Sequence, residues 1–364
     1  MSTEQSKAEA LSEYVGTEAV REAHRFDVAR LADYMRRNVD ESIRTVEVEQ
    51  FKGGQSNPTY LVRANGKRYV LRRKPPGKLL PSAHAVDREY RVITALARTE
   101  VPVAKTYALC LDDSVIGTAF YIMDYVDGRI FWDPRLPGLA PAERAAIFDE
   151  MNRVIAALHT VDYAAIGLGD YGKAGNYFAR QIDRWTKQYR AAETERIEAM
   201  ENLIAWLPQH IPADDTTCIV HGDYRLDNVI YHPTEPRIVA VLDWELSTLG
   251  HPLADFSYHC MTWRFDPGQF RGLAGADLAA LGIPSEREYV AAYCRRVGRP
   301  EIPEKEWEYY IAFGMFRLVG ILQGVLARAL QGNASNRHAL EAGRRARPLA
   351  EAAWAQVEKM MTRT

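Results

Sequence analysis

The residues best suited by type and spacing to do chemistry form the run HGDYRLDN at positions 221–228. This run places a carboxylate at Asp223 and an amide at Asn228, and a further carboxylate, Asp243, follows the apolar segment IVAVL at 238–242. Transfer of a phosphoryl group from ATP needs a carboxylate that accepts the proton of the attacking hydroxyl, and oxygen ligands that hold Mg²⁺. The pattern therefore predicts a phosphotransferase site with Asp223 as the base and with Asn228 and Asp243 as the metal ligands.

Neighbouring residues have expected roles around Asp223. Asp and Asn near strand ends often only complete turns, but the spacing H-x-D-x-x-x-x-N followed by a later Asp is rare by chance. Arg225 is expected to stabilise the charge on the transferred phosphoryl group, and the alternative is an ion pair with Asp227 that braces the loop. His221 and Asp255 are expected to brace the loop backbone rather than to touch substrate.

Upstream, the segment FKGGQSN at 51–57 joins two predicted strands. Glycine lacks a side chain, so the backbone amides of such a turn can approach phosphate oxygens closely. This segment matches neither G-x-G-x-x-G nor the Walker pattern, and an ordinary hairpin turn is the alternative. We predict that this turn binds the nucleotide through Gly53, Gly54, Ser56 and Asn57.

A cation for the nucleotide phosphates is expected in the next strand. Arg72 ends the segment YVLR (69–72), at the position where protein kinases place a Lys that binds the α- and β-phosphates. Arg keeps the charge and can bind phosphate through two donors. Glu89, in the following predicted helix, is its expected partner, with an incidental surface ion pair as the alternative. If the strand register were shifted by one residue, Arg72 would lie on the opposite face of the sheet, and Arg73 would take its place toward the nucleotide.

The elements that must position these residues change in type along the chain. The first part contains short segments rich in β-branched and aromatic residues, with Asn65-Gly66 marking a tight hairpin. Strands are predicted at 44–51, 58–64, 67–73, 103–109 and 118–126, and a helix at about 85–97. Beyond a hinge at 124–128, helices are predicted at about 141–158, 175–207, 285–297, 303–331 and 335–361, with short strands near 217–221, 229–231 and 237–242.

These patterns predict an α+β protein with two lobes. We expect a mobile N-terminal tail over 1–20, a nucleotide-binding N-lobe over 21–126 with a small antiparallel sheet, and a mainly helical C-lobe over 127–364. The C-lobe is expected to carry the catalytic residues and to bind the acceptor.

The composition is that of a globular protein and excludes two classes of partner. The 364 residues are 47% hydrophobic and 26% charged, which argues against long disordered segments. Lys and Arg number 46 against 48 Asp and Glu, for a formal net charge of -2. This balance offers no general attraction for nucleic acid or for an anionic membrane, so any anion must be bound locally.

Other features of the sequence concern location. Residues 1–16 lack the apolar core of a secretory signal, so we expect a cytoplasmic protein. The most apolar stretch, 311–330, contains Arg317 and Arg328, which favours a buried helix over a membrane span. Reduced, buried thiols and no zinc site are expected, because the cysteines lie far apart: Cys110, Cys218, Cys260 and Cys294.

The residues alone do not identify the acceptor. Aromatic residues on helices usually form core, so the large side chains that could line an acceptor pocket are expected to be structural: Trp185, Tyr189, Tyr258, Trp263 and Arg317. No run of Lys and Arg marks a site for the phosphates of a CoA-like acceptor.

The chain resembles the aminoglycoside-phosphotransferase-like kinases. The resemblance is narrower to the kinase domain that some acyl-CoA dehydrogenases carry at their N-terminus, and to its stand-alone bacterial relatives. It weakens after about residue 265 and rests on the 221–228 run together with GGQSNPTY (53–60), YVLRRKPPG (69–77), LLPSAHAVDREY (79–90), GRIFWDPRLPGL (128–139) and VLDWELSTLGHPLADF (241–256).

This resemblance implies a fold and a function. The fold is bilobal and protein-kinase-like, and the cofactors are ATP and Mg²⁺. The narrower group implies phosphorylation of a hydroxyl of a hydroxyacyl-CoA, notably at the 4-position, in the breakdown of hydroxy acids. A separate acyl-CoA dehydrogenase-like enzyme is then expected to process the phosphorylated product.

Two other functions stay open on the sequence. One is a kinase of another small hydroxyl compound, such as an aminoglycoside or a choline-like alcohol, and the other is a catalytically silent, kinase-like binding protein. An aminoglycoside is a polycation that needs many acidic groups, and the C-terminal half shows no acidic clustering. A silent protein should have lost at least one of Asp223, Asn228 and Asp243, and all are present.

Overall fold

The computed structural model describes residues 16–52, 57–76, 84–268, 270–331 and 339–362. The chain forms two compact units: unit 1 comprises Met1–Gly128 with Val239–Glu245, and unit 2 comprises Arg129–Ile238 with Leu246–Thr364. Residues 1–15, most of the predicted tail, lie outside the described residues. Thr17–Glu18 form β1, which pairs with β2, whereas the sequence pattern predicts a tail through residue 20.

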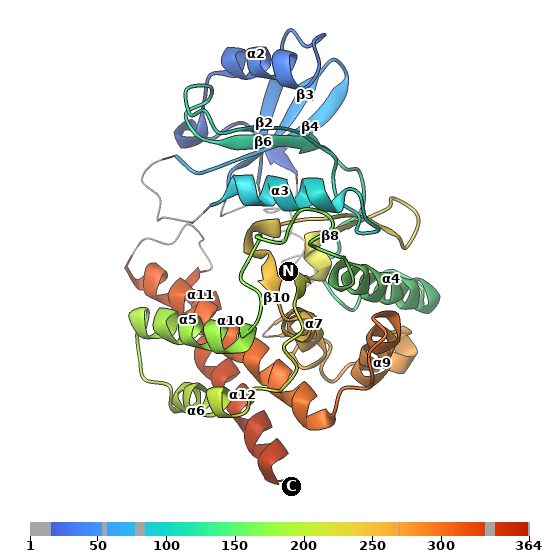
Figure 1. Ribbon diagram of the computed structural model, residues 1–364, viewed down its shortest axis with the longest axis vertical. Coiled ribbons are helices and arrows are strands. Elements are labelled where there is room, and N and C mark those ends of the chain that lie inside the picture. Colours follow the sequence, from blue (N-terminus) through green and yellow to red (C-terminus); the bar gives the residue numbers. More distant parts are fainter. Residues whose placement is uncertain (1–15, 53–56, 77–83, 269, 332–338, 363–364) are drawn as a thin grey trace, which may run out of the picture. The chain divides into compact units, whose positions relative to one another are not determined.

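Unit 1 is built on an antiparallel sheet of six strands in the order β1-β2-β3-β4-β6-β5. After β1 the strands are β2 (Glu47–Phe51), β3 (Thr59–Ala64), β4 (Lys67–Arg73), β5 (Thr106–Cys110) and β6 (Phe120–Asp124). The sheet lies between two helices, α2 (Val28–Asn38) and α3 (Val86–Leu96) (Figure 1). The small antiparallel sheet predicted for the N-lobe is confirmed.

The core of unit 1 fills the space between the sheet and α2. Leu31 and Met35 of α2 are fully buried against Tyr60, Leu71 and Phe120 of the strands. The helix begins at Asp27, whose side chain accepts a hydrogen bond from the backbone of Arg30 (3.0 Å), as an N-cap residue does. The sequence pattern did not predict this helix. On the opposite side, α3 packs on β5 and β6.

The register of β4 separates two adjacent arginines. Successive side chains of a strand point to opposite faces, so Arg72 and Arg73 face opposite sides of the sheet. Arg73 is buried on the α2 side, where it donates to the carbonyls of Ile116 and His24 (both 3.1 Å) and lies 5.0 Å from the ring of Phe26. Arg72 therefore faces α3, as predicted, and the alternative register is wrong.

A segment far along the sequence packs with unit 1. β9 (Ile238–Val241) leads into residues 239–245, and the backbone N–H of Val241 donates to the carbonyl of Pro102 (2.9 Å). This segment carries Asp243, which the sequence-based division assigned to the C-lobe.

Unit 2 is mainly helical. Its helices are α4 (Pro141–His159), α5 (Tyr177–Ala191), α6 (Glu198–Trp206), α7 (Pro252–Cys260), α8 (Leu278–Leu281), α9 (Glu286–Arg296), α10 (Glu304–Leu330), α11 (Ala339–Gly343) and α12 (Ala346–Thr362). Its short strands are β7 (Cys218–Val220), β8 (Val229–Tyr231) and β10 (Thr248–Gly250), and β7 pairs with β10 in antiparallel fashion. The single helical stretch predicted at 175–207 is two helices, α5 and α6.

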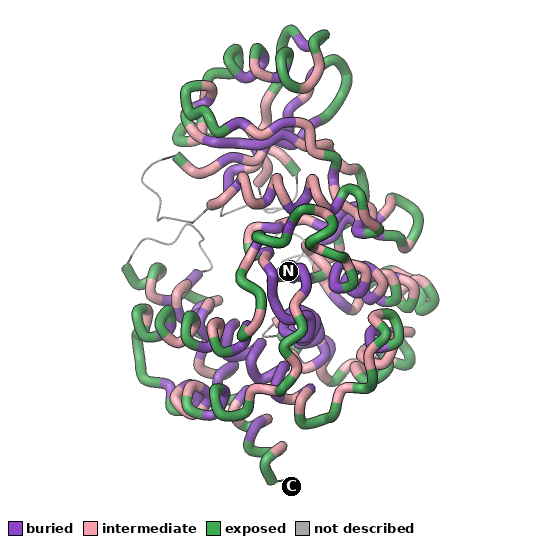
Figure 2. Tube along the Cα trace, viewed as in Figure 1, coloured by how far each residue is buried: buried purple, intermediate pink, exposed green. Residues whose placement is uncertain are grey.

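α10 is the central helix of unit 2. It is long and apolar enough to cross a membrane, yet 67% of its most apolar window is buried inside the structure. It packs against α5, α7, α11 and α12, and Figure 2 shows the buried positions concentrated along α7 and α10. The predicted buried helix is confirmed. All four cysteines are likewise buried and unpaired.

The buried position of Arg73 leads to a stability prediction. Arg73→Met should lower the free energy of unfolding by about 1–3 kcal/mol, because the carbonyls of Ile116 and His24 would lose their donor inside the core. Urea unfolding measures this change. The matched control is Arg63→Met on the neighbouring strand β3, where the side chain is 41% exposed and a change within about 0.5 kcal/mol is expected. Equal losses in both variants would contradict the register.

Candidate active site

In unit 1, one guanidinium holds three carboxylates. Arg72 Nε lies 2.9 Å from Glu89 Oε2, and Arg72 Nη2 lies 2.7 Å from Asp243 Oδ1 and 3.2 Å from Glu245 Oε2. The Arg72 side chain is 11% exposed. Burial alone would lower the pKa of Arg72, but Glu89 and Asp243 outweigh this effect and raise it well above its usual range. The predicted pair of Arg72 and Glu89 is confirmed, within a larger cluster.

Glu89 is fixed by two further donors. Asn57 Nδ2 donates to Glu89 Oε1 (2.8 Å), and the hydroxyl of Tyr121 donates to Oε2 (3.1 Å). Burial raises the pKa of Glu89 to about 7, against the lowering effect of Arg72. Asp243 and Glu245 raise it as well, because several carboxylates share one cation. The cluster therefore has an excess of negative charge that an additional cation would relieve.

The glycine turn predicted to bind the nucleotide is only partly described. Gly53, Gly54 and Ser56 lie outside the described residues. Asn57 is fully buried, and its side chain contacts Glu89 and, through Oδ1, the Nδ1 atom of His84 (2.9 Å). Asn57 thus supports the Arg72 cluster, and nucleotide binding by this turn stays a prediction.

Asp243 reaches Arg72 from an unusual backbone conformation. Its φ angle is +61°, in the left-handed region, which costs an ordinary L-residue roughly 1–2 kcal/mol and which Asp tolerates better than most. The indole N–H of Trp244 donates to the carbonyl of Val241 (3.0 Å) and closes this turn. The turn brings the carboxylates at 243 and 245 to the same guanidinium.

The chemistry of these donors fits Mg²⁺. Magnesium prefers oxygen ligands and is usually bound through one or two carboxylates together with substrate phosphates. In the described ranges of the chain, no group of three or more His, Cys, Asp or Glu side chains is arranged to hold a metal ion.

In unit 2, the 221–228 loop brings the other predicted residues together. Asn228 Nδ2 donates to the backbone carbonyl of Asp223 (2.9 Å) and to its Oδ2 (3.0 Å). Arg225 Nε lies 3.4 Å from Asp223 Oδ1, and Arg225 Nη2 lies 3.3 Å from Asp227 Oδ2. The ion pair with Asp227 that was considered for Arg225 is therefore present, and its role in stabilising the phosphoryl group stays a prediction. Because Asn228 points its amide nitrogen at Asp223, its amide oxygen is the atom that would bind a metal ion.

The surroundings of Asp223 suit a base. Burial raises the pKa of its carboxyl above the usual value, while Arg225 and His221 act to lower it. A raised pKa makes a carboxylate a better proton acceptor, provided that it stays ionised at the working pH.

The backbone of the loop is braced from α7. Asp255 accepts hydrogen bonds from the N–H groups of His221 (2.6 Å) and Gly222 (2.8 Å), and His159 Nε2 lies 3.3 Å from its carboxylate. Asp223 N–H donates to His221 Nδ1 (3.2 Å). The structural roles predicted for His221 and Asp255 are confirmed.

Gly222 must be glycine for two reasons. Its φ is +87°, and a Cβ atom there would lie 2.9 Å from the carbonyl oxygen of Leu246. The backbone conformation and the closeness of Leu246 therefore require glycine at the position before Asp223.

The sequence analysis missed a group of residues beside this loop. Arg317 Nη2 donates to the carbonyl of Gly222 (2.6 Å), and its guanidinium lies 4.8 Å from the ring of Tyr258 and 5.6 Å from that of Trp185. Sequence reasoning assigned all three to the core. The available signal was a charged residue inside the most apolar helix, since a buried cation needs a polar partner.

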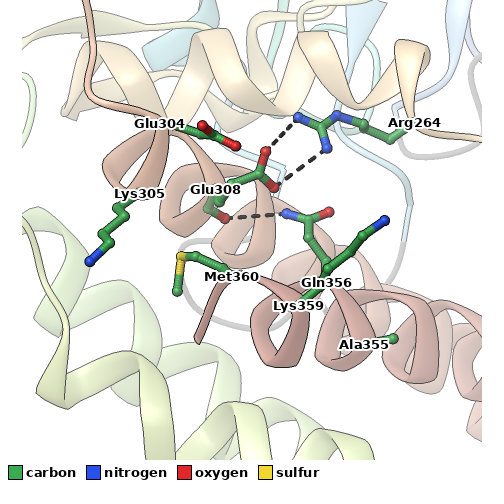
Figure 3. A pocket seen from close by; sticks show the side chains of 8 residues that line it. All are labelled: Arg264, Glu304, Lys305, Glu308, Ala355, Gln356, Lys359 and Met360. Carbon is green, nitrogen blue, oxygen red and sulfur yellow. Dashed lines mark hydrogen bonds and ion pairs between the residues drawn. The ribbon is translucent and has the colours of Figure 1, made fainter. Parts of the chain in front are cut away.

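Two cavities lie elsewhere in unit 2. One, of about 450 Å³, lies between Arg264, α10 and α12 (Figure 3). The guanidinium of Arg264 is already paired there, because it contacts Glu286 (2.6 Å) and Glu308 (2.8 Å). The other, of about 840 Å³, is lined by α4, α8 and α9. Neither is lined by a residue of the 221–228 loop.

Residues 47–293, well over half of the chain, match the model of the phosphotransferase enzyme family. The chain belongs to this family. The family resemblance seen in the motifs is thereby confirmed, and the chain is a kinase-type enzyme.

Curated relatives share this region with the chain. Acyl-CoA dehydrogenase family member 10 of Mus musculus is 50% identical over 312 residues, which cover 85% of this chain and 29% of that protein. Acyl-CoA dehydrogenase family member 11 of Homo sapiens is 42% identical over 334 residues, covering 90% of this chain and 43% of that protein. The chain thus spans less than half the length of these relatives.

Solved structures confirm the kinase-like fold. A Ralstonia eutropha JMP134 protein, provisionally named as an aminoglycoside phosphotransferase, is 61% identical with a TM-score of 0.85, covering 92% of this chain and 99% of that one. The aminoglycoside phosphotransferase APH(4)-Ia, in a ternary complex with ADP and hygromycin B, has a TM-score of 0.58 at 14% identity, covering 90% of this chain and 98% of that one. At that identity it shows the fold alone.

The brace from Asp255 leads to a second stability prediction. Asp255→Asn should lower the free energy of unfolding at pH 7 by about 1–3 kcal/mol, because an amide presents an N–H₂ group to the N–H donors of the loop. Urea unfolding tests this. The matched control is Asp149→Asn on α4, 65% exposed, with an expected change within about 0.5 kcal/mol.

The same variant has a predicted pH dependence. Burial alone would raise the pKa of Asp255, but the contacts with His159 and His221 lower it below its usual value. A lowered folded-state pKa contributes stability above the unfolded-state pKa of about 3.9, and the contribution is lost as the pH falls through the folded-state value. The difference between wild type and Asp255→Asn should therefore shrink below about pH 4. A constant difference would contradict the ionised state of Asp255.

Proposed function

We propose that this enzyme transfers the γ-phosphoryl group of ATP to a hydroxyl of a hydroxyacyl-CoA, with the 4-hydroxyl as the preferred position. The observation that carries the kinase chemistry is the partly buried carboxylate of Asp223, held by Asn228 and Arg225 in the loop that matches the predicted phosphotransferase pattern. The acyl-CoA acceptor is supported by the relatives at 42–50% identity, which are named as acyl-CoA dehydrogenase family members.

In the proposed reaction, Asp223 accepts the proton of the acceptor hydroxyl. The hydroxyl oxygen forms the new bond to the γ-phosphorus, the bond from that phosphorus to the β-phosphate oxygen breaks, and ADP leaves. Arg225 offers a guanidinium beside Asp223 to the charge that develops on the phosphoryl oxygens. Its 49% exposed side chain can adjust to a substrate.

The residues of unit 1 would bind the nucleotide. Arg72 would contact the phosphates through its guanidinium while Glu89 fixes its orientation. Asp243 would hold Mg²⁺, which neutralises phosphate charge when bound. The role of Asn228 as a further Mg²⁺ ligand stays a prediction from the sequence. The excess negative charge around Arg72 supports a cation in this place.

A hydroxyacyl-CoA kinase also implies a second enzyme. Phosphorylation converts a hydroxyl into a leaving group, so an enzyme of the acyl-CoA dehydrogenase type that processes the phosphorylated acyl chain is the proposed functional partner. The names of the relatives support this partnership.

The base gives the first activity prediction. Asp223→Asn should keep the fold and ATP binding, while turnover falls by about 10²–10⁴-fold, the usual contribution of a general base. Because the base acts deprotonated and burial raises its pKa, wild-type activity should rise with pH through a midpoint above about 3.9. Steady-state kinetics from pH 4 to 8 measure both effects, and near-normal turnover of a folded Asp223→Asn would exclude Asp223 as the base.

Arg72 gives the second activity prediction. The affinity for Mg·ATP should fall in the order wild type, Glu89→Ala, Arg72→Lys, Arg72→Ala. Lys keeps the charge but not the planar fork, whereas Ala removes the cation and should cost about 1.5–3 kcal/mol of binding free energy. Calorimetry measures the series, with Arg63→Ala as the exposed control. Wild-type affinity in Arg72→Ala would place the phosphate-binding cation elsewhere.

An acceptor panel tests the proposed substrate class. ADP release is measured with 4-hydroxyacyl-CoAs, other hydroxyacyl-CoAs, free hydroxy acids, choline and aminoglycosides. The proposal expects acceptor-dependent turnover with the hydroxyacyl-CoAs, and Asp223→Asn should abolish it. Turnover with an aminoglycoside or choline alone would overturn the substrate assignment.

A further inference from the structure

Arg317 of α10 is a buried cation with unused hydrogen-bond donors. It is 7% exposed, and among the described residues its guanidinium has one hydrogen-bond acceptor, the carbonyl of Gly222 (2.6 Å), and no carboxylate within ion-pair distance. A guanidinium carries five N–H donors, and arginine is almost never buried unless its charge is compensated. This side chain can therefore donate to a further oxygen atom.

A second unused donor lies beside Arg317. Its guanidinium lies 5.6 Å from the ring of Trp185 on α5, and the Nε1 atom of this indole is buried without an acceptor in the part of the chain that the structure describes. Unpaired buried donors are rare in native proteins, because they cost free energy. Gly320 of α10 leaves space for the ring, since a Cβ atom there would lie only 3.3 Å from Cε3 of Trp185.

The aromatic rings of this group already hold cations. The guanidinium of Arg317 lies 4.8 Å from the ring of Tyr258 on α7, and that of Arg184 lies 5.7 Å from the ring of Trp185. Aromatic faces attract cations, and here guanidinium groups of the protein take that place. A choline-like or aminoglycoside cation would therefore meet the positive charge of Arg317 and be repelled.

These donors lie next to the proposed base. Gly222, whose carbonyl binds Arg317, immediately precedes Asp223, and Tyr258 interacts electrostatically with the Asp223 carboxylate. The Asp223 side chain is 20% exposed, so a substrate hydroxyl can reach it. The guanidinium and the indole N–H donate hydrogen bonds and accept none. The group that they can bind on an acceptor is therefore an oxygen atom with free lone pairs.

We propose that Arg317 and Trp185 bind the carbonyl oxygen of the acceptor's acyl group while the acceptor hydroxyl reaches Asp223. The inference rests on the proposed function, in which an acyl compound is the acceptor and Asp223 is the base. It makes Arg317 and Trp185 specificity residues, which select an acyl compound over a cationic alcohol and favour a hydroxyl only a few bonds from the carbonyl. A thioester and a free carboxylic acid both present such an oxygen.

A binding cycle that changes the protein and the ligand together tests this contact. Calorimetry measures the affinity of the full-length protein for a 4-hydroxyacyl-CoA and for its thioether analogue, in which CH₂ replaces the carbonyl, with Mg·ADP present so that no phosphoryl transfer occurs. In wild type the thioether should bind about 10–100-fold more weakly, as expected for the loss of a hydrogen bond to a charged group.

The Arg317→Gln variant completes the cycle. The carbonyl ligand should lose affinity by about the same 10–100-fold factor, whereas the affinity for the thioether should change less than about twofold. An equal loss for both ligands would overturn the proposal, because a purely structural role of Arg317 affects both alike.

Further variants separate the contact from the fold. Trp185→Phe keeps an aromatic ring but removes the N–H, so it should weaken binding of the carbonyl ligand about 3–10-fold and leave the thioether unchanged. The controls are Arg328→Gln, at an exposed position of α10, and Trp354→Phe on α12, which should leave both affinities unchanged. If Arg317→Gln does not fold, Trp185→Phe decides: no loss, or an equal loss for both ligands, would overturn the proposal.

A second pair of ligands distinguishes a thioester from a free acid. A free 4-hydroxy acid and the diol that carries an alcohol in place of its carboxyl group are titrated in the same way. Preference for the CoA ester supports the thioester carbonyl as the bound group. Binding of the free acid in place of the ester, with the same dependence on Arg317, supports the carboxylate and defeats the CoA assignment. Binding of choline or an aminoglycoside in place of both would overturn the proposal.

Turnover distinguishes this proposal from the proposed function. With an accepted substrate, Arg317→Gln should raise the KM for the acyl acceptor about 10–100-fold and leave the KM for Mg·ATP unchanged. Carbonyl-dependent binding without phosphorylation of any hydroxyacyl-CoA would defeat the proposed function and support the binding site. Phosphorylation of a hydroxyacyl-CoA, with equal losses for both ligands in Arg317→Gln, would support the function and overturn the site.

Discussion

The first unit depends on the ion pairs of one buried guanidinium. Taking Arg72 out of water is costly, and the cost is offset only where several acceptors surround it. Glu89 comes from a helix, while Asp243 and Glu245 come from a segment more than a hundred residues further along the chain. The planar fork of Arg can contact carboxylates in several directions, which the point charge of Lys cannot. The same interaction compensates the left-handed backbone of Asp243 and ties residues 239–245 to the sheet.

In unit 2 the buried charge is negative, and it is compensated by donors and cations. The carboxylate of Asp223 is partly buried, and donors and cations around it oppose the effect of that burial on its ionisation. The backbone on which it stands is fixed by Asp255 on one side and Arg317 on the other. Phosphoryl transfer depends on positioning and electrostatics more than on covalent chemistry by the protein, so this arrangement serves the proposed reaction.

The sequence predicted those features of the fold and the site that follow a known motif or a regular hydrophobic pattern. The comparison with the strand cation and helix glutamate of protein kinases predicted that Arg72 pairs with Glu89, and the pair is present. The helix α2 was missed because its buried stripe is short, with Leu31, Ala32 and Met35 as its buried residues. The H-x-D-x-x-x-x-N spacing predicted that Asp223 and Asn228 belong to one site, and the structure brings their side chains into contact. Their roles as base and metal ligand stay predictions.

What the sequence could not show are contacts between distant segments. A local pattern indicates which face of a helix is buried but not which element covers it, so Arg317 was assigned to the core although its partner is the carbonyl of Gly222. For the same reason, nothing in residues 239–245 indicated that they pack with the sheet of unit 1.

The central claim is that the carboxylate of Asp243, beside Arg72, binds nucleotide phosphates through Mg²⁺. The most direct measurement is a calorimetric titration of a non-hydrolysable ATP analogue into wild type, Asp243→Ala and Asn228→Ala, each with and without Mg²⁺. We predict that Mg²⁺ tightens binding to wild type at least about tenfold, as expected for an anionic metal ligand, tightens binding to Asn228→Ala less, and has no effect on Asp243→Ala. An equal gain from Mg²⁺ in wild type and Asp243→Ala would contradict the account.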